Sequence, residues 1–528
     1  MDLHGKHLIG ASTSAEAAAD GFQGVNPATG ETMEPVYQEA TQAEVDRAFE
    51  LAAQAHREMK KIDRGRRADL LDLIADKLDA IQDEWIARAD AETARSVPGL
   101  AFEMGRTLNQ IRMFAGYVRE GSWLGARIEH ADRDRRPVPK SDTRVLNIAL
   151  GPVAVFGASN FPLAFSVPGG DTIAALAARC PVVVKAHPAH PGTSEMAGVA
   201  IAEAVAESGF PEGTFSMLHG AGYEVGLAMT RHPLAKAVAF TGSLGGGRAL
   251  FDAAAARPTP IPVFAEMGST NPIFVLPEAA KEHGTAIAKG MRATVTMSVG
   301  QLCTCPGFLV GLESPALDEL RGQMAGYFEG AKDQVMLHAG IRSNFERGVE
   351  RVAGTAGVEQ AGSLIEAGAG GADASAVMFS TDAATFMANE DLRHEVFGPS
   401  TMVVSCSSPE EMIAMAESFD GQLTATIHGT PADLEEYSGL VSVLEEKAGR
   451  VLIGGFPAGV EVCHAMVHGG PYPATTDSRT TSVGTAAIDR FLRPVCYQDF
   501  PQSLLPLELQ DDNVTGVLRL VDGEWSKD

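Results

Sequence analysis

A regular alternation of short apolar runs with helical segments, beginning at Pro152, narrows the possible folds of this chain more than any other property of its sequence. The apolar runs include PVAVFGAS, PVVVKAH, TFSMLHG and AKAVAFTG, and the segments between them include GGDTIAALAARC, TSEMAGVAIAEAVAESG and GYEVGLAMTRH. Near-continuous apolar strands separated by helices are typical of a parallel sheet that is buried on both faces. The pattern predicts an open α/β domain of the nucleotide-binding kind, with Thr193 or Ser194 as the N-cap of its second helix.

A second α/β unit follows, from about Pro262 to Gly470. Its apolar runs include PVFAEMG, PIFVLP, GFLVGL, TMVVSC, LTATIHG and RVLIGG. A chain of 528 residues is too long for one hydrophobic core, so more than one unit is expected. We predict a first domain made of residues 1–128 and 149–261 and a second domain made of residues 262–470.

The segments outside these units predict helices and an extended arm. Apolar residues at three- and four-residue spacing indicate helices over 44–59, 68–94 and 111–128, with the second ending at Val97-Pro98-Gly99. Residues 129–142 are polar and contain prolines, and a strand, RVLNIALGPVAVFG, follows. They suit a linker or a β-hairpin arm, and the extended geometry before proline favours the arm. Residues 129–148 and 471–528 are therefore assigned to an arm and a tail.

Composition excludes several classes of partner. The net charge of −26 argues against nucleic acid and disfavours an anionic membrane surface. The sequence has no apolar stretch of about 20 residues and no signal-peptide core at its start. The six cysteines form no CxxC pair, which favours reduced thiols and a cytoplasmic location. Cys303-Thr304-Cys305 has no matching His or Cys spacing nearby, so no metal is expected.

Three residues are candidates for catalysis. Cys303, in SVGQLCTCPGFLV, lies between a helix-like segment and an apolar strand, where a thiol can be a nucleophile or simply a small buried residue. Glu266, in PVFAEMGST, is acidic within an apolar strand; burial would raise its pKa toward that of a general base, but a structural ion pair explains it equally. Asn160 follows the first parallel strand, where its amide can donate to an oxyanion or form an Asx-turn.

Three more motifs are expected at the same edge of the sheet. Lys185 ends the strand PVVVKAH and can reach a ribose or a phosphate. FTGSLGGG (240–247) leads a strand through a glycine-rich turn into a helix, where backbone N–H groups can hold a pyrophosphate. In HEVFGP (394–399), Glu395 can accept from ribose hydroxyls while Phe397 packs beside a base. Each of these motifs also has an ordinary explanation as surface or core.

In their order and spacing, these motifs resemble the aldehyde dehydrogenase superfamily. SNFP, VVVK, FTGS, the strand glutamate, GQxC and HEVFGP occur in the family's order, and NPATGE (26–31) extends the resemblance over roughly residues 20–500. The resemblance implies an α/β fold with two open parallel α/β domains, one for the cofactor and one for catalysis. It also implies that the β-hairpin arm is an oligomerisation arm, so a homodimer or homotetramer is expected.

The resemblance also implies roles for individual residues. Cys303 would be the nucleophile, Glu266 the general base and Asn160 the oxyanion donor. The residues assigned to the cofactor are Lys185, Ser243, Gly242, Phe240, Glu395, Phe397 and His187. A glutamate that hydrolyses a thioester favours oxidation to an acid over acyl transfer to coenzyme A or reduction of an acyl phosphate. Retention of all three catalytic candidates argues against a nonenzymatic structural protein on this scaffold.

Departures from the commonest family pattern indicate a narrower branch. Ser159 stands where tryptophan is usual, Met267-Gly268-Ser269 replaces a double glycine, and Pro188 stands where many NAD-using relatives carry glutamate. With VFGASNFPLAFSVPGGD and KAHPAHPGTSE, these features resemble the α-ketoglutaric semialdehyde (2,5-dioxovalerate) dehydrogenases and the NADP-dependent fatty-aldehyde dehydrogenases of luminous bacteria. The expected reaction is NAD(P)-dependent oxidation of 2,5-dioxovalerate to 2-oxoglutarate, with a long-chain or other aliphatic aldehyde as the alternative.

Substrate and cofactor preferences complete the expectations. Arg106, on the helix that by resemblance lines the substrate tunnel, would clamp a distal carboxylate or else be a solvated helix charge, and Phe161 is the second substrate residue. NADP is the preferred cofactor and NAD remains possible, because Pro188 offers no carboxylate to repel a 2′-phosphate. The groups expected near that phosphate are Lys185, His187, His190, Thr193 and Ser194, the last two at a helix N-terminus.

Overall fold

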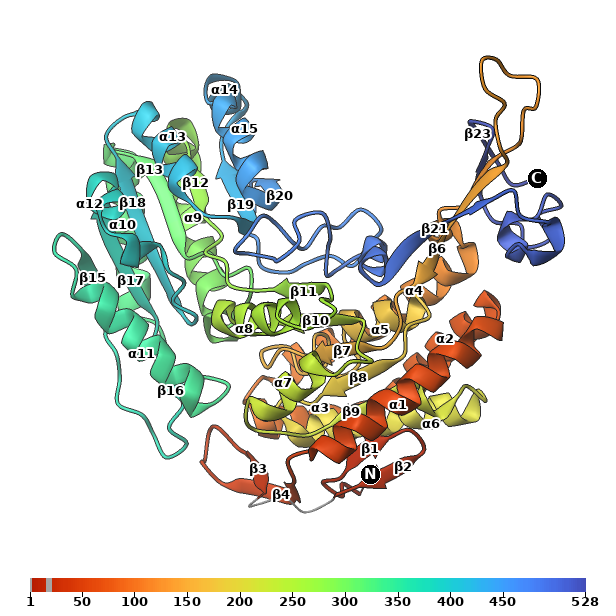
Figure 1. Cartoon of the computed structure of the whole chain (residues 1–528). Helices are drawn as coiled ribbons and strands as arrows, with labels where there is room; N and C mark the ends of the chain where they lie inside the picture. The colour runs from red at the N-terminus through yellow and green to blue at the C-terminus, as the bar shows by residue number, and fades with distance from the viewer. Residues whose placement is uncertain (1, 16–20) are drawn as a thin grey trace.

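The apolar runs form two twisted sheets that lie side by side, and a smaller sheet projects from them as an arm (Figure 1). The structure is a computed structural model that describes residues 2–15 and 21–528. The predicted α/β architecture with two largely parallel sheets is confirmed.

The first sheet carries the order β11-β10-β7-β8-β9-β1-β2. Its parallel strands are β7 (Val153–Phe156), β8 (Val182–Lys185), β9 (Phe215–Leu218), β10 (Ala237–Thr241) and β11 (Val263–Glu266), and the antiparallel edge is β1 (His7–Ile9) with β2 (Ser12–Ser14). Alternate side chains enter two separate hydrophobic clusters. Val153 and Val155 face one cluster and Ala154 faces the other, so helices must cover both faces.

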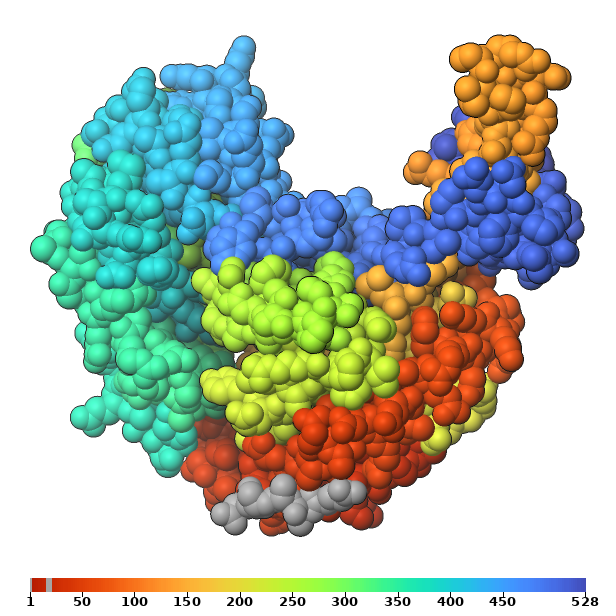
Figure 2. Space-filling view, in the orientation of Figure 1, coloured from red at the N-terminus to blue at the C-terminus, as the bar shows by residue number. Residues whose placement is uncertain are grey.

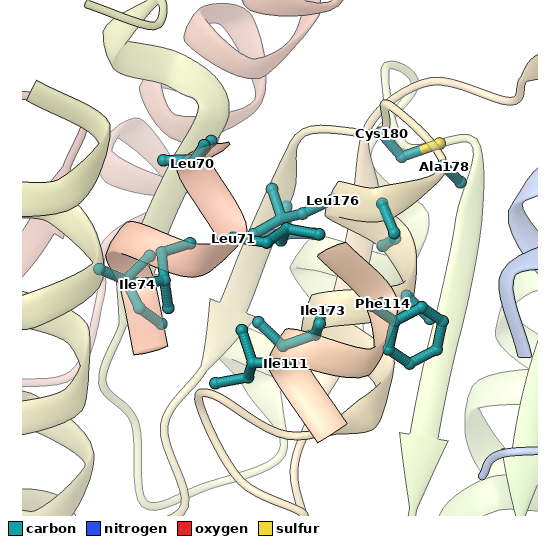
Figure 3. Packing of buried hydrophobic residues seen from close by; sticks show 14 of the residues in the cluster. Leu70, Leu71, Ile74, Ile111, Phe114, Ile173, Leu176, Ala178 and Cys180 are labelled. Atoms are coloured by element: carbon teal, nitrogen blue, oxygen red, sulfur yellow. The ribbon is translucent and has the colours of Figure 1, made fainter. Parts of the chain in front are cut away.

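One of these clusters is drawn in Figure 3, where leucine, isoleucine and phenylalanine side chains from three helices interlock. Helices α2, α4, α5 and α6 contribute to this cluster, whereas α1, α7 and α8 contribute to the other. The helices are α1 (Gln42–Glu58), α2 (Arg64–Ala80), α3 (Gln82–Thr93), α4 (Val97–Glu120), α5 (Gly170–Ala177), α6 (Pro191–Glu207), α7 (Glu224–Arg231) and α8 (Leu244–Ala255).

The second sheet has the order β15-β17-β18-β13-β12-β19-β20. Its strands are β12 (Ile273–Val275), β13 (Phe308–Leu312), β15 (Glu359–Ala361), β17 (Val377–Asp382), β18 (Ser400–Cys406), β19 (Gln422–His428) and β20 (Ala448–Ile453). Its helices are α9 (Pro277–Thr296), α10 (Pro315–Glu329), α11 (Ala339–Ala353), α12 (Ala383–Ala388), α13 (Pro409–Ser418), α14 (Pro431–Glu436) and α15 (Ser438–Lys447). Of the helices that the structure describes, none combines the length and apolar character needed to cross a membrane.

The arm is the predicted hairpin. β5 (Arg127–Glu129) pairs antiparallel with β6 (Thr143–Ala149), and the polar turn between them stands clear of the body (Figure 2). The tail completes this sheet in the order β21-β6-β5-β22-β23, with β21 (Leu492–Gln498), β22 (Arg519–Val521) and β23 (Glu524–Ser526). Two small ribbons lie elsewhere: β3 (Phe22–Val25) with β4 (Thr32–Tyr37), and β14 (Gln334–Val335) with β16 (Asp373–Ala374).

Two domain boundaries differ from the prediction. Strand β11, which the sequence placed in the second unit, pairs with β10 and belongs to the first sheet. The change of sheet therefore falls between Glu266 and Ile273, and not at residue 262. Residues 471–491, assigned to the tail, lie against β11: Thr475 bridges to Glu266, and the N–H of Met267 donates to Ala474 O at 2.8 Å.

Several local boundaries also differ, because capping residues set them. Val97-Pro98-Gly99 begins a helix instead of only ending one, since the Ser96 side chain caps α4 and proline suits the first helical turn. That helix ends at Gly121 in the left-handed conformation, so it does not continue to residue 128; Ser122–Leu124 form a short 3₁₀ turn instead. The N-cap of α6 is His190, and not Thr193 or Ser194. The run RVLNIALGPVAVFG is two strands, β6 and β7, in different sheets.

Candidate active site

The catalytic candidates meet where the two sheets adjoin. Glu266 is the last residue of β11, and Asn160 follows β7 in the same sheet, with β10 between the two strands, so both lie at the carboxyl ends of parallel strands. Cys303 lies in the loop between α9 and β13 of the second domain. The site is therefore assembled from both domains.

The backbone leading to Cys303 is held in a strained conformation. Ser298 and Val299 have left-handed φ angles of 49° and 58°, which are costly for a β-branched residue. Gly300 continues the turn with φ +65°, and a Cβ on it would lie 2.2 Å from the carbonyl oxygen of Gly398. The HEVFGP loop is thus packed directly against the turn that presents the cysteine.

The Cys303 thiol, an imidazole and a carboxylate form one hydrogen-bonded chain. Cys303 Sγ lies 3.3 Å from His468 Nε2, and the same nitrogen lies 3.0 Å from Glu266 Oε1. The other oxygen of Glu266 accepts a short hydrogen bond from Ser482 Oγ. The His468 side chain is 1% exposed and that of Glu266 3% exposed, so bulk water does not compete for this chain of contacts.

The charges of His468 and Glu266 stabilise each other. Burial alone would lower the pKa of His468, but Glu266 and Cys303 outweigh burial and raise it to about 10. Burial likewise opposes ionisation of Glu266, yet His468, Ser482 and Arg490 lower the pKa of this carboxyl group. The expected rise in the pKa of Glu266 is therefore wrong, because an imidazolium is its hydrogen-bond partner.

Asn160 lies beside the cysteine loop. Its Nδ2 donates to the carbonyl oxygen of Gln301 at 2.9 Å, two residues before Cys303. The Arg95 guanidinium donates to the backbone oxygen of Asn160 and lies 4.7 Å from the centre of the Phe161 ring. Asn160 is thus held through both its side-chain amide and its backbone oxygen.

Arg106 reaches the same region from helix α4. Its guanidinium lies 4.9 Å from the Phe165 ring centre, and that ring lies 6.3 Å from the His468 ring. Burial lowers the pKa of the Arg106 guanidinium, and the nearby carboxylates of Glu103 and Glu266 oppose this shift. Both terminal nitrogens of Arg106 are buried, and neither has a hydrogen-bond partner among the described residues. Its Nε makes a long contact of 3.4 Å to Val460 O.

The glycine-rich turn has the form expected of an anion site. Ser243 is the N-cap of α8, where its Oγ accepts from Gly246 N at 3.2 Å. The Phe240 ring packs under the turn, so a Cβ on Gly242 would lie 2.6 Å from it. A side chain at Gly245 would meet no other atom within 4 Å, so this end of the helix is open to a ligand.

Lys185 is the last residue of β8 in the same sheet, and His187 follows this strand. Lys185 Nζ donates to Gly220 O at 2.6 Å, and burial lowers the pKa of this ammonium to about 8. His187 is half-buried and its ring stacks on that of His190, with centres 5.4 Å apart.

The N-terminus of α6 differs from the expectation. Glu92 accepts from the backbone N–H groups of Gly192 and Thr193 at 2.9 and 2.8 Å and from the Thr193 hydroxyl at 2.7 Å. Thr193 and Ser194 are fully buried, and His190 is bonded to Ser194. These amides are therefore not free to hold a phosphate.

The HEVFGP loop places its two candidate residues near the end of β11. Glu395 is exposed, and its Oε2 approaches so closely that a Cβ on Gly268 would lie 2.7 Å from it. Glu395 and Phe397 line a cavity of about 30 Å³ that also borders Cys305 and Ser269. Both lie on the same side of the site as the cysteine loop.

Sequence comparison assigns this site to a family. Residues 13–471 match the aldehyde dehydrogenase family. The chain belongs to this family. Like its other members, it is an NAD(P)-dependent oxidoreductase that acts on aldehydes.

Relatives and solved structures extend the comparison. The aldehyde dehydrogenase is 47% identical over 525 residues to alpha-ketoglutaric semialdehyde dehydrogenase 2 of Azospirillum brasilense, covering 99% of this chain and 100% of the relative. It is 43% identical to alpha-ketoglutaric semialdehyde dehydrogenase of Acinetobacter baylyi, covering 98% of each chain. The crystal structure of betaine aldehyde dehydrogenase from Staphylococcus aureus in complex with NAD⁺ superposes with a TM-score of 0.80 at 19% identity, over 94% of this chain and 96% of that one, and so shares the fold.

His468, Phe165 and Ser482 are site residues that sequence reasoning missed. His468 lies 165 residues after Cys303 and 202 residues after Glu266, so no local spacing connects them. In the sequence, His468 is marked only by the polar turn His-Gly-Gly-Pro, and this pattern is typical of an ordinary loop. His468, Cys303 and Glu266 also offer three ligand-type atoms within 4.8 Å of one another, a grouping that the cysteine spacing alone did not suggest.

The effect of the His468 charge on Cys303 can be tested through the reactivity of the thiol. In His468→Asn, alkylation of Cys303 by iodoacetamide at pH 7 should slow about tenfold or more, because a hydrogen bond to a charged group contributes about 1.5–3 kcal/mol. Since the pKa of His468 is about 10, its charge persists across neutral pH, and the difference from wild type should shrink as the pH rises past that value.

Peptide mass mapping gives the rate at each cysteine, and exposed Cys496 serves as the reference within the same molecule. Equal rates at Cys303 in both proteins at pH 7, with an unchanged unfolding temperature, would show that His468 does not activate the thiol.

Proposed function

We propose that the chain oxidises 2,5-dioxovalerate (α-ketoglutaric semialdehyde) to 2-oxoglutarate with NAD(P)⁺. The observation that carries this substrate is Arg106, a half-buried residue whose two terminal nitrogens are buried and lack protein partners among the described residues. The full-length relatives named alpha-ketoglutaric semialdehyde dehydrogenase support the same substrate.

Acylation begins at the sulfur. His468 stabilises the Cys303 thiolate, which attacks the aldehyde carbon. The Asn160 amide, already beside the cysteine loop, donates to the oxyanion that forms. A neutral amide is required there, because a carboxylate would repel this charge. The nicotinamide cofactor, when bound, supplies the hydride acceptor, and a thioester on Cys303 remains.

Deacylation uses Glu266, which lies at the other end of the hydrogen-bonded series from Cys303. Once the sulfur is acylated it carries no charge, so His468 keeps only Glu266 as an ionic partner. Glu266 takes a proton from the attacking water, and His468 and Ser482 hold the carboxylate in place during the transfer. The tetrahedral adduct collapses, the carboxylic acid leaves, and the thiolate is restored beside the imidazolium.

The residues assigned to the cofactor fit a dinucleotide. The open N-terminus of α8 at Ser243 suits the pyrophosphate, Lys185 suits the adenosine ribose or a phosphate on it, and exposed Glu395 suits the second ribose. Phe240 instead supports Gly242 from below, and His187 flanks Lys185.

Two variants test acylation and deacylation separately. Cys303→Ala should abolish reduced-cofactor formation with 2,5-dioxovalerate while leaving cofactor affinity unchanged. Glu266→Gln should give a burst of one equivalent of reduced cofactor followed by a slow phase, because the thioester forms but hydrolyses about a hundredfold or more slowly without its base. Stopped-flow absorbance and cofactor titration make these measurements. Turnover by Cys303→Ala with Cys305 intact would move the nucleophile.

Arg106 is proposed to bind the distal carboxylate. A planar guanidinium can hold a carboxylate through two parallel hydrogen bonds, and Arg106 has both terminal nitrogens available. Phe161 and Phe165, packed edge to face at 5.5 Å, form the apolar wall beside it. A long-chain aliphatic aldehyde, the alternative substrate, would leave these two buried nitrogens without a partner, which is costly.

In Arg106→Met, kcat/KM for 2,5-dioxovalerate should fall about a hundredfold, the equivalent of losing ~2.7 kcal/mol of charged hydrogen bonding. The value for an uncharged aldehyde of similar length should stay within a few-fold. Arg112→Met is the matched control, since Arg112 lies on the same helix in an exposed pair with Asp76. Equal losses for the charged and the uncharged aldehyde would contradict the assignment.

NADP is proposed as the preferred cofactor. Pro188 provides no carboxylate against a 2′-phosphate, and Lys185 provides a positive charge. The α6 amides do not contribute, because Glu92 occupies them. The proposed preference for NADP therefore rests on the positive charge of Lys185 and on the absence of a carboxylate at position 188.

The ratio of kcat/KM values for NADP and NAD measures this preference and should favour NADP. Pro188→Glu should lower the value for NADP far more than that for NAD, since the new charge repels only the phosphate. A tenfold preference of the wild type for NAD, or an equal effect of the substitution on both cofactors, would contradict the assignment.

A dimer, or a dimer of dimers, is the assembly we propose. β21 forms the outer edge of the arm sheet and β20 the edge of the second sheet, so each offers unpaired backbone groups to another subunit. Light scattering at micromolar concentration should give at least twice the chain mass of 55.5 kDa, and a monomer would contradict this assembly.

A further inference from the structure

Cys303, His468 and Glu266 bring together the three kinds of atom that bind zinc in proteins, a sulfur, an imidazole nitrogen and a carboxylate oxygen. These three atoms lie within 4.8 Å of one another. No second group of three such side chains with this spacing occurs in residues 2–15 and 21–528, so the arrangement suits one ion per chain.

The distances between these atoms are close to those of a tetrahedral zinc site. Cys303 Sγ lies 3.3 Å from His468 Nε2, which lies 3.0 Å from Glu266 Oε1. Zinc bonds of about 2.3 Å to sulfur and about 2.0–2.2 Å to nitrogen and oxygen place the ligand atoms of a tetrahedron about 3.4–3.6 Å apart. An ion would therefore push the nitrogen away from its two partners by about 0.3–0.4 Å and draw the sulfur and the oxygen toward each other.

The charges of the three side chains also suit a divalent cation. The thiolate of Cys303 and the carboxylate of Glu266 carry one negative charge each, and the His468 imidazolium offsets only one of them. A divalent ion bound to neutral His468 offsets both. This balance matters because the His468 and Glu266 side chains are almost fully buried, where an unpaired charge is costly.

Two arginines near the site carry the same sign of charge as a metal ion, but each also has a carboxylate of its own. Arg490 acts on Glu266 and pairs with Asp171 at 2.8 Å. Arg106 lies under the influence of the buried carboxylate of Glu103. The two arginines are thus partly compensated before any ion binds.

Neighbouring residues hold two of the ligands in place. Ser482 Oγ donates to Glu266 Oε2, which leaves Oε1 for the ion. The Asn271 amide donates to the carbonyl oxygen of Cys303 at 2.9 Å and fixes the backbone below the sulfur. Hydrogen bonds of this kind orient metal ligands and strengthen binding.

The sulfur side of the group is the side open to an ion. Cys303 is half-buried, whereas Glu266 and His468 are buried behind it. Three protein ligands leave the fourth position of a tetrahedron for a water molecule.

We propose that Cys303 Sγ, His468 Nε2 and Glu266 Oε1 bind one Zn²⁺ ion and that this ion reversibly inhibits the enzyme. Sulfur and imidazole ligands select zinc over Mg²⁺ and Ca²⁺, which prefer oxygen. The ion takes the place of the proton on His468 Nε2, and that proton leaves to solvent without any change of oxidation state. Because the nucleophile and the base are both occupied, neither attack on the aldehyde nor hydrolysis of a thioester can proceed.

Co²⁺ is the probe for the site, because a thiolate bound to Co²⁺ gives a charge-transfer band in the near ultraviolet. Titration of the untagged full-length protein without oxygen should develop this band and saturate at one ion per chain. One equivalent of Zn²⁺ should then abolish the band. Saturation without a thiolate band overturns the proposal.

Cys303→Ala should lose the band, and His468→Asn should weaken Co²⁺ binding by more than the about 10–100-fold that loss of an outer partner of a ligand costs. Cys305→Ala is the matched control, because this neighbouring thiol lies outside the group, and it should keep the band. A band that persists in Cys303→Ala, disappears in Cys305→Ala or forms with unchanged affinity in His468→Asn overturns the site.

Protection of the thiol gives a second test that needs no variant. Saturating Zn²⁺ should slow alkylation of Cys303 by iodoacetamide at least about tenfold, because the bound thiolate is no longer free to react. Exposed Cys496 is the reference, and EDTA should restore the rate. An unchanged rate at Cys303 overturns the proposal.

A crystal of the wild-type protein soaked in Zn²⁺ locates the ion directly. Anomalous diffraction at the zinc edge should show a peak bonded to Cys303, His468 and Glu266, and a peak that lacks any of these ligands overturns the site. None of these measurements uses an aldehyde or a cofactor. Absence of turnover with 2,5-dioxovalerate in zinc-free enzyme would therefore contradict the proposed function and not the metal site.

Discussion

The imidazole of His468, placed between a thiol and a carboxylate, is the contact on which the arrangement of the site depends. One nitrogen meets both Cys303 and Glu266 at hydrogen-bond distance, in a region where fewer than one-twentieth of either ionic side chain is exposed. Ionic groups removed from water are stable only when each is paired and hydrogen-bonded. The site therefore has to bring together three segments, the end of β11, the loop before β13 and the turn at His468. The junction of two sheets supplies that meeting point.

Holding these segments in register requires a backbone under strain. Left-handed conformations at Ser298 and Val299 cost about 1–3 kcal/mol each and persist only where the surroundings enforce them. The close contact between Gly300 and Gly398, which leaves no room for a side chain, holds the backbone in this conformation. The side-chain amide of Asn271 then donates to the carbonyl oxygens of Cys303 and Cys305 at 2.9 and 3.0 Å. The sulfur is thus positioned from both sides of its loop, independently of the imidazole.

Sequence patterns predicted the strands and three of the residues that we propose to be catalytic, because these depend on local chemistry. Apolar runs report burial on both faces, and a lone acid or thiol at a strand end is visible without a structure. The patterns did not predict His468 or the lowered pKa of Glu266, since both depend on contacts between residues far apart in the chain. The boundary at residue 262 was wrong for a related reason. The apolar pattern of β11 is the same whichever sheet it joins, and only its pairing with β10 decides.

The two helix N-termini near the cofactor region show how a correct local rule can give a wrong site. Both α6 and α8 follow parallel strands of one sheet and carry the free N–H groups that attract anions. At α6, a carboxylate of the protein, Glu92, already accepts from two of these groups, and Arg88 pairs with Glu92 at 2.8 Å. At α8, Ser243 uses one N–H and the glycines beyond it leave the helix end uncovered. A net charge of −26 does not attract an anionic dinucleotide, so the proposed binding site depends on local groups, the α8 end and Lys185.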